Sequence, residues 1–210
     1  MKKGLTTKRI YRVAIILIII SLIYAMIISI INKEWLILFV SCLTVIIAIS
    51  PFFFKRRFNL RVPTEIELII ILFIYASLFL GEVYNFYQIF WWWDILLHAI
   101  SAIIFGFIGF TILYFMIKRH ELNAKPWAIT IFSFSFALAI GAIWEIIEFS
   151  IDQFFGLNMQ KSGLLDTMGD LIVDALGAIF ASTIAFIYLK TKKTLIFHQV
   201  VEKISDKPKT

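Results

Sequence analysis

Long apolar stretches alternate with short polar segments along almost the whole of this chain. Each stretch is close in length to the ~20 residues that an α-helix needs to cross the hydrocarbon core of a bilayer. The pattern therefore predicts an all-α fold, a polytopic membrane protein with six transmembrane helices. We expect these helices at residues 10–31, 35–54, 66–87, 95–117, 127–150 and 167–189.

Composition supports the same fold class. Of the 210 residues, 61% are hydrophobic, and the mean hydropathy of +0.92 exceeds what a soluble domain needs. The single cysteine, Cys42, excludes a disulfide framework and a paired-cysteine metal site within this sequence. The first apolar stretch is longer than the ~7–15 residues of a signal-peptide core, and no small-residue cleavage site follows it. We therefore expect it to remain as an uncleaved membrane anchor.

The basic residues fall on alternate loops. Lys and Arg gather in the N-terminal segment, in the loops at 55–65 and 118–126, and in the C-terminal tail, whereas the other connections hold only Lys33 and Lys161. The positive-inside rule then places both termini in the cytoplasm. Basic clusters beside span ends also meet anionic lipid headgroups, which explains the net charge of +6. Because no base-reading element accompanies them, we expect the lipid bilayer as a partner and no nucleic acid.

Acidic residues gather near the outer ends of the last three predicted spans. Within each span they recur at intervals of three or four residues, which places each set on one face of its helix. The sets are Asp94 with His98, Glu145 with Glu148 and Asp152, and Asp166 with Asp170 and Asp174. Farther inward the same faces carry Gly, Ala and Ser, and such small residues let membrane helices pack closely.

We therefore expect these three helices to pack tightly in their cytoplasmic halves and to open outward into a cup lined with carboxylates. The span at 66–87, which carries Glu82, is the natural fourth wall. The chain then has three parts. They are a basic segment with two scaffold helices at 1–65, a four-helix transmembrane bundle with an outward-facing acidic site at 66–189, and a basic cytoplasmic tail at 190–210.

So many carboxylates in one cup need counter-charge. Two carboxylates that share a site already oppose each other's ionisation, and Lys161 is the one basic residue near the outer ends of these spans. Oxygen ligands with one imidazole suit Mg²⁺, Mn²⁺, Fe²⁺ or Zn²⁺, and ligand type does not choose among them. The sequence thus predicts a site for one or more divalent metal ions. Its expected ligands are Asp94, His98, Glu145, Glu148, Asp152, Asp170 and Asp174, with Glu82 and Asp166 as additional candidates.

Two of these residues have equally simple structural explanations. Asp166 is also explained as the N-cap of the last span, and Asp152 as a solvated residue at a helix end. Asp174 and Glu145 lie deeper, where a charged group costs at least ~2.5–3.5 kcal/mol at mid-bilayer and is functional by default.

Three motifs follow one another in the pattern of a known family. They are "FWWWDILLHAISA", "WEIIEFSIDQFFGLNMQ" and "LLDTMGDLIVDALGA". Over residues 84–178 the chain resembles the YjdF-like inner membrane proteins of bacteria, a family without an assigned function. The resemblance does not extend to the first two spans. It implies a multi-pass protein of the bacterial plasma (inner) membrane, and its signature positions are Asp94, His98, Glu145, Glu148, Asp152, Asp166, Asp170 and Asp174.

Three functions remain open from the sequence. A metal held at the extracytoplasmic face could activate water and clamp a phosphate or ester, as in a hydrolase or transferase acting on a lipid-linked substrate. Alternatively, the cup is the outward-facing site of a cation or proton-coupled transporter. In a third reading the acids are non-catalytic and hydrogen-bond the helices together.

Overall fold

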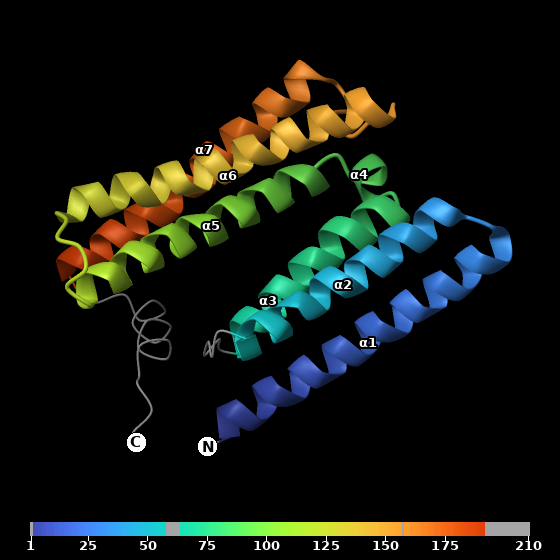
Figure 1. Cartoon of the computed structure of the whole chain (residues 1–210), viewed down its shortest axis with the longest axis horizontal. Helices are drawn as coiled ribbons and strands as arrows, with labels where there is room; N and C mark the ends of the chain where they lie inside the picture. Colours follow the sequence, from blue (N-terminus) through green and yellow to red (C-terminus); the bar gives the residue numbers. More distant parts are fainter. Residues whose placement is uncertain (1, 58–63, 157, 192–210) are drawn as a thin grey trace. The chain divides into compact units, whose positions relative to one another are not determined.

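The computed structural model describes residues 2–57, 64–156 and 158–191, and all regular structure in these ranges is helical (Figure 1). The all-α prediction is therefore confirmed. The helices are α1 (Lys2–Asn32), α2 (Trp35–Arg57), α3 (Thr64–Ile74), the π-helix η1 (Tyr75–Val83), α4 (Phe86–Ile89), α5 (Trp93–Lys118), α6 (Pro126–Phe155) and α7 (Leu164–Thr191).

Four of these helices are long and apolar enough to cross a membrane. They contain the segments Arg9–Asn32, Trp93–Lys118, Pro126–Phe155 and Leu164–Thr191. A shorter apolar helical segment spans Trp35–Ser50. These helices support a multi-pass membrane protein, whereas the count of six spans and the orientation of the termini stay predictions.

The third predicted span is not one regular helix. The helix expected over 66–87 begins as α3 and continues as the π-helix η1, which ends at Val83. Asn85 then adopts a left-handed conformation with φ of 55°, and the short helix α4 follows. The ring of Tyr87 packs against Gly81 and occupies the space that a side chain at position 81 would fill. Hydropathy predicts that such a segment is buried in lipid or protein but does not register its hydrogen-bonding pattern.

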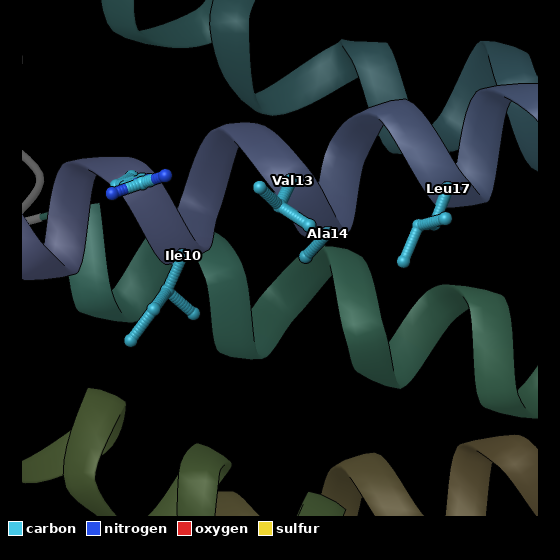
Figure 2. A pocket seen from close by; sticks show the side chains of 5 residues that line it. Ile10, Val13, Ala14 and Leu17 are labelled. Atoms are coloured by element: carbon cyan, nitrogen blue, oxygen red, sulfur yellow. The ribbon is translucent and has the colours of Figure 1, made fainter.

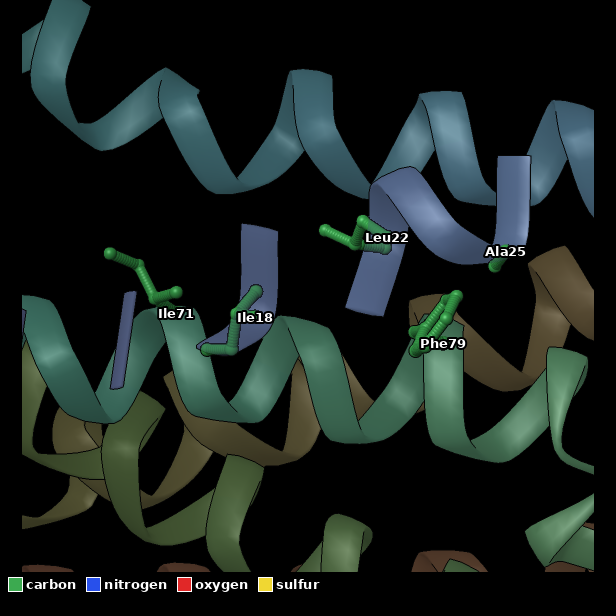
Figure 3. Packing of buried hydrophobic residues seen from close by; sticks show 5 residues of the cluster. All are labelled: Ile18, Leu22, Ala25, Ile71 and Phe79. Carbon is green, nitrogen blue, oxygen red and sulfur yellow. The ribbon is translucent and has the colours of Figure 1, made fainter. Parts of the chain in front are cut away.

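The chain forms two compact units, of which the first comprises α1 to α4. Its apolar core contains Ile18, Leu22 and Ala25 of α1, packed with Ile71 of α3 and Phe79 of η1 (Figure 3). Both α3 and η1 also contact α2. A four-helix bundle over 66–189 therefore stays a prediction, because the structure does not place the two units relative to each other.

One shallow hollow lies on the surface of α1. It has a volume of about 370 Å³ and is lined by Arg9, Ile10, Val13, Ala14 and Leu17 (Figure 2). The Ile10, Val13 and Leu17 side chains are at least half exposed. An apolar surface of this kind suits contact with lipid chains, and the scaffold role expected for the first helix stays a prediction.

The second unit is a bundle of α5, α6 and α7, in which every pair of helices is in contact (Figure 1). Small side chains make the close approach possible, as the sequence predicted. Ala137 of α6 and Ala181 of α7 are fully buried, and Gly106 of α5 lies against Ala181. The Ser133 hydroxyl of α6 donates a 2.6 Å hydrogen bond to the Gly106 carbonyl oxygen. This contact joins α6 to the backbone of α5.

The connections of the bundle follow ordinary helix-end chemistry. Pro126 occupies the first turn of α6, where its missing N–H removes no helical hydrogen bond. The helix ends at Gly156, which has a left-handed φ of 66° and donates its backbone N–H to the Asp152 carbonyl oxygen. The loop to α7 starts there, at the same end of the bundle as the first residues of α5. Most of the predicted basic tail at 190–210 lies outside the described residues.

Candidate metal centre

His98 lies at the centre of the acidic residues of the bundle. Its buried imidazole contacts one carboxylate from each of the three helices. Nδ1 lies 3.3 Å from Oδ2 of Asp174 on α7. Nε2 lies 3.7 Å from Oε1 of Glu145 on α6 and 3.8 Å from Oδ1 of Asp94 on α5. The three stripes predicted from residue spacing therefore meet at this imidazole.

Two groups of side chains bring their ligand atoms within 4.8 Å of one another. The inner group is His98, Glu145 and Asp170, all of them buried. The outer group is Asp94, Asp166 and the same Asp170, of which the first two are half-buried. Asp170 belongs to both groups, so its carboxylate lies between two candidate cation positions.

Glu145 is the most unusual residue of the inner group. It is only 4% exposed, and its carboxylate oxygens make no well-formed hydrogen bond in the described part of the chain beyond a weak contact with the Thr167 side chain. Oδ1 of Asp174, which is 0% exposed, is without a hydrogen-bond partner among these residues. Buried carboxylates are costly unless they are paired, hydrogen-bonded or bound to a metal. The buried oxygen atoms of Glu145 and Asp174, on either side of His98, thus form an environment that suits a cation.

The distance between His98 and Glu145 suits two ligands of one metal ion. Metal–ligand bonds of about 2.0–2.2 Å place two ligands of one ion roughly 3 to 4.3 Å apart. The 3.7 Å between His98 Nε2 and Glu145 Oε1 falls in this range. On the opposite side of the ring, Nδ1 lies 3.3 Å from Oδ2 of Asp174. With the proton on Nδ1, this is the usual way in which a second carboxylate orients a metal-binding histidine. Asp174 belongs to neither ligand group, so its expected role as a ligand stays a prediction.

Asp174 occupies its position because position 141 of α6 has no side chain. A Cβ atom at Gly141 would overlap Oδ2 of Asp174 and stand 2.7 Å from its Cγ. The sequence pattern shows only that Gly, Ala and Ser occupy the inward part of this face of α6, and Gly141 is one of these small residues. Its particular role could not be found there, because it depends on which residue of α7 faces α6 at that level.

One cation of the chain reaches the outer group. Nζ of Lys161, in the loop between α6 and α7, lies 2.8 Å from Oδ2 of Asp94. Asp152 holds this loop, because its two carboxylate oxygens accept the backbone N–H groups of Met159, at 2.7 Å, and Gln160, at 2.9 Å. Lys161 therefore reaches the acidic cluster, as its place in the sequence suggested.

Three other expected ligands, Glu148, Asp152 and Glu82, are not members of either group. Oε1 of Glu148 accepts a 3.0 Å hydrogen bond from the Trp144 indole, and Asp152 has the loop contacts just described. Glu82 lies in η1 of the first unit. A ligand role for these three residues stays a prediction. Asp166 is not the N-cap of α7, because the helix begins two residues earlier, at Leu164; its place is in the first turn.

Comparison with known proteins finds a family model that matches most of the chain. A family model described as "Predicted membrane protein (DUF2238)" matches residues 10–191, which include the N-terminal helices that the sequence resemblance left out. An uncharacterized protein of Thermotoga maritima is 27% identical over 137 residues, which cover 65% of this chain and 70% of that protein. No solved structure matches. The chain belongs to the DUF2238 family of membrane proteins.

Proposed function

We propose that this chain is a metal-dependent membrane enzyme, a hydrolase or transferase that acts on a lipid-linked substrate. The metal is a divalent ion held by His98, Glu145 and Asp170. The observation that carries the proposal is the Glu145 carboxylate, which is only 4% exposed and 3.7 Å from the His98 imidazole, and which has a weak contact with the Thr167 side chain but no well-formed hydrogen bond from the described residues. Burying an ionised carboxylate costs several kcal/mol if nothing compensates it, and a bound cation supplies that compensation.

Three protein ligands are fewer than a divalent metal ion usually binds. Three protein ligands keep coordination positions open for water and substrate, which distinguishes catalytic metal sites from closed structural ones. A metal in such a site polarises a phosphate or ester and activates water. Asp94, half-buried and with Oδ1 3.8 Å from His98 Nε2, would be a carboxylate able to accept a proton from water at the site. Asp174 keeps the imidazole oriented.

We also propose the membrane orientation that the charge distribution indicates. Six spans with both termini in the cytoplasm would place the metal centre at the extracytoplasmic end of the bundle. The proposed location is the bacterial plasma (inner) membrane, with the bilayer as partner and no nucleic acid. A lipid-linked substrate could then approach the site from the outer leaflet.

The two other functions have less support. Transport needs a path beyond the site, and the helix interface below Asp174 is filled by Ala137, Ala178 and Ala181, each no more than 1% exposed. A purely structural role needs the acids to hydrogen-bond the helices together. The buried oxygens of Glu145 supply little of this, because they make no well-formed hydrogen bond with the described residues beyond a weak contact with Thr167 of α7.

Elemental analysis of detergent-purified protein tests the proposal, with Glu145→Gln as the matched variant because it keeps shape and removes charge. We expect a stoichiometric divalent metal in the wild type and its loss in the variant. Release of product from a long-chain alkyl phosphate and from a long-chain ester, with and without chelator, tests catalysis. Wild-type protein without metal contradicts the metal centre. Metal without turnover, together with Mn²⁺ flux into proteoliposomes, would favour transport.

A further inference from the structure

Lys161 brings its ammonium group to the outer group of carboxylates, where it pairs with Asp94. The Lys161–Asp94 pair is largely enclosed, with side-chain exposures of 26% and 16%. Lys161 also interacts electrostatically with Asp166, the other half-buried member of the outer group. The remaining described Lys and Arg residues of this unit lie at the opposite end of the bundle, at Lys118, Arg119, Lys125 and Lys190.

The loop that carries Lys161 is held on both sides. Asp152 accepts the backbone N–H groups of the two preceding residues, Met159 and Gln160. The Gln160 side-chain amide donates a 2.6 Å hydrogen bond to the Thr167 hydroxyl of α7. Gly163, with a left-handed φ of 63°, then turns the chain into the helix. These hydrogen bonds fix the loop, and the loop holds the Lys161 ammonium group beside the outer group.

Without this lysine, the carboxylates have the layout of a two-metal site. Asp170 is shared by the inner and outer groups, as a bridging carboxylate would be. Paired catalytic metals lie about 3.5–4 Å apart, a separation that one bridging carboxylate can span. An ammonium group 2.8 Å from Asp94 Oδ2 already supplies a positive charge to this carboxylate, and it would repel a second cation bound to the same group.

We propose that the ammonium group of Lys161 is a built-in cation that fills the outer group, so that the centre takes one metal ion where its carboxylates would otherwise bind two. The inference rests on the proposed metal centre and specifies its stoichiometry. Asp152, expected from the sequence to be a ligand, is then a positioning residue, which acts on the centre through the loop backbone and Lys161.

Mn²⁺ titration of metal-free full-length protein in detergent tests this. Bound ions are counted from the free Mn²⁺ signal in electron paramagnetic resonance. We expect one ion in the wild type and in Lys161→Arg, and two in Lys161→Ala, with a spectrum broadened by magnetic coupling. Lys161→Ala combined with Asp166→Asn should bind one ion again, because Asp166 belongs only to the outer group. Asp152→Ala should gain the second ion as Lys161→Ala does.

The outcomes separate this inference from the proposed function. One ion in Lys161→Ala, or two in the wild type, overturns the role of Lys161 and leaves the metal centre intact. One ion in Asp152→Ala beside two in Lys161→Ala overturns the positioning role of Asp152. A wild type that binds no Mn²⁺ contradicts the proposed function itself.

Discussion

Replacing Gly141 by alanine tests how α6 and α7 build the site. The new Cβ would stand 2.7 Å from Cγ and 3.2 Å from Cβ of Asp174, whereas carbon atoms pack at about 3.5–4.0 Å. The Asp174 carboxylate must therefore move by about 1 Å. That movement lengthens the 3.3 Å contact with His98 Nδ1 beyond hydrogen-bonding distance.

Two effects of Gly141→Ala follow from this geometry. Overpacking of the interface should cost about 1–3 kcal/mol of unfolding free energy. Loss of the carboxylate that orients a metal-binding histidine typically lowers metal affinity about 10–100-fold. Thermal unfolding of metal-free protein measures the first effect, and calorimetric titration with Mn²⁺ measures the second. Asp174→Asn should reproduce the loss of affinity, since the amide is a weaker acceptor for the His98 N–H.

The matched control is Gly169→Ala on the exposed face of α7. No atom lies within 4 Å of the position that its Cβ would occupy, so metal affinity should stay at the wild-type value. Helix propensity favours Ala over Gly by about 1 kcal/mol, so stability should rise slightly. If Gly141→Ala binds Mn²⁺ as tightly as Gly169→Ala does, the packing of Asp174 against Gly141 of α6 does not orient His98. That result would refute the reasoning.

Two further predictions concern the bundle and its orientation. Ser133→Ala removes the hydrogen bond to the Gly106 carbonyl and should lower stability by about 0.6 kcal/mol, the average for such bonds in membranes, with metal content unchanged. Thermal unfolding checks this, and a loss of metal would contradict it. In a Cys42→Ser background, Ser162→Cys should react with a membrane-impermeant maleimide in intact cells, and Glu121→Cys only after permeabilisation. The reverse pattern would invert the proposed topology.

The sequence was enough to find the residues that meet in the bundle. Spacings of three and four residues fix which side chains share a helix face, whatever the neighbours are. That argument placed Asp94 with His98 and put Asp170 and Asp174 on one stripe of α7. The small residues farther along the same stripes predicted the close contact of the three helices.

The sequence could not show which carboxylates face the candidate metal centre and which hydrogen-bond to the backbone or to another side chain. That division depends on how each helix is rotated about its own axis and on the path of the loops. Asp152 lies on the same face as Glu145, yet it turns toward backbone N–H groups seven and eight residues farther on. The pairing of Glu148 with Trp144 is the exception, because a donor one helical turn before an acid can be read from spacing alone.

The central claim is that His98 Nε2 binds a metal ion while Asp174 holds its other nitrogen. Pulsed electron paramagnetic resonance of the Mn²⁺-loaded protein tests it most directly, because it detects nitrogen bonded to the metal. The account predicts coupling to one imidazole nitrogen, which disappears in His98→Ala and persists in a variant that lacks His120. Tightly bound Mn²⁺ without nitrogen coupling, or coupling that survives in His98→Ala, would contradict it.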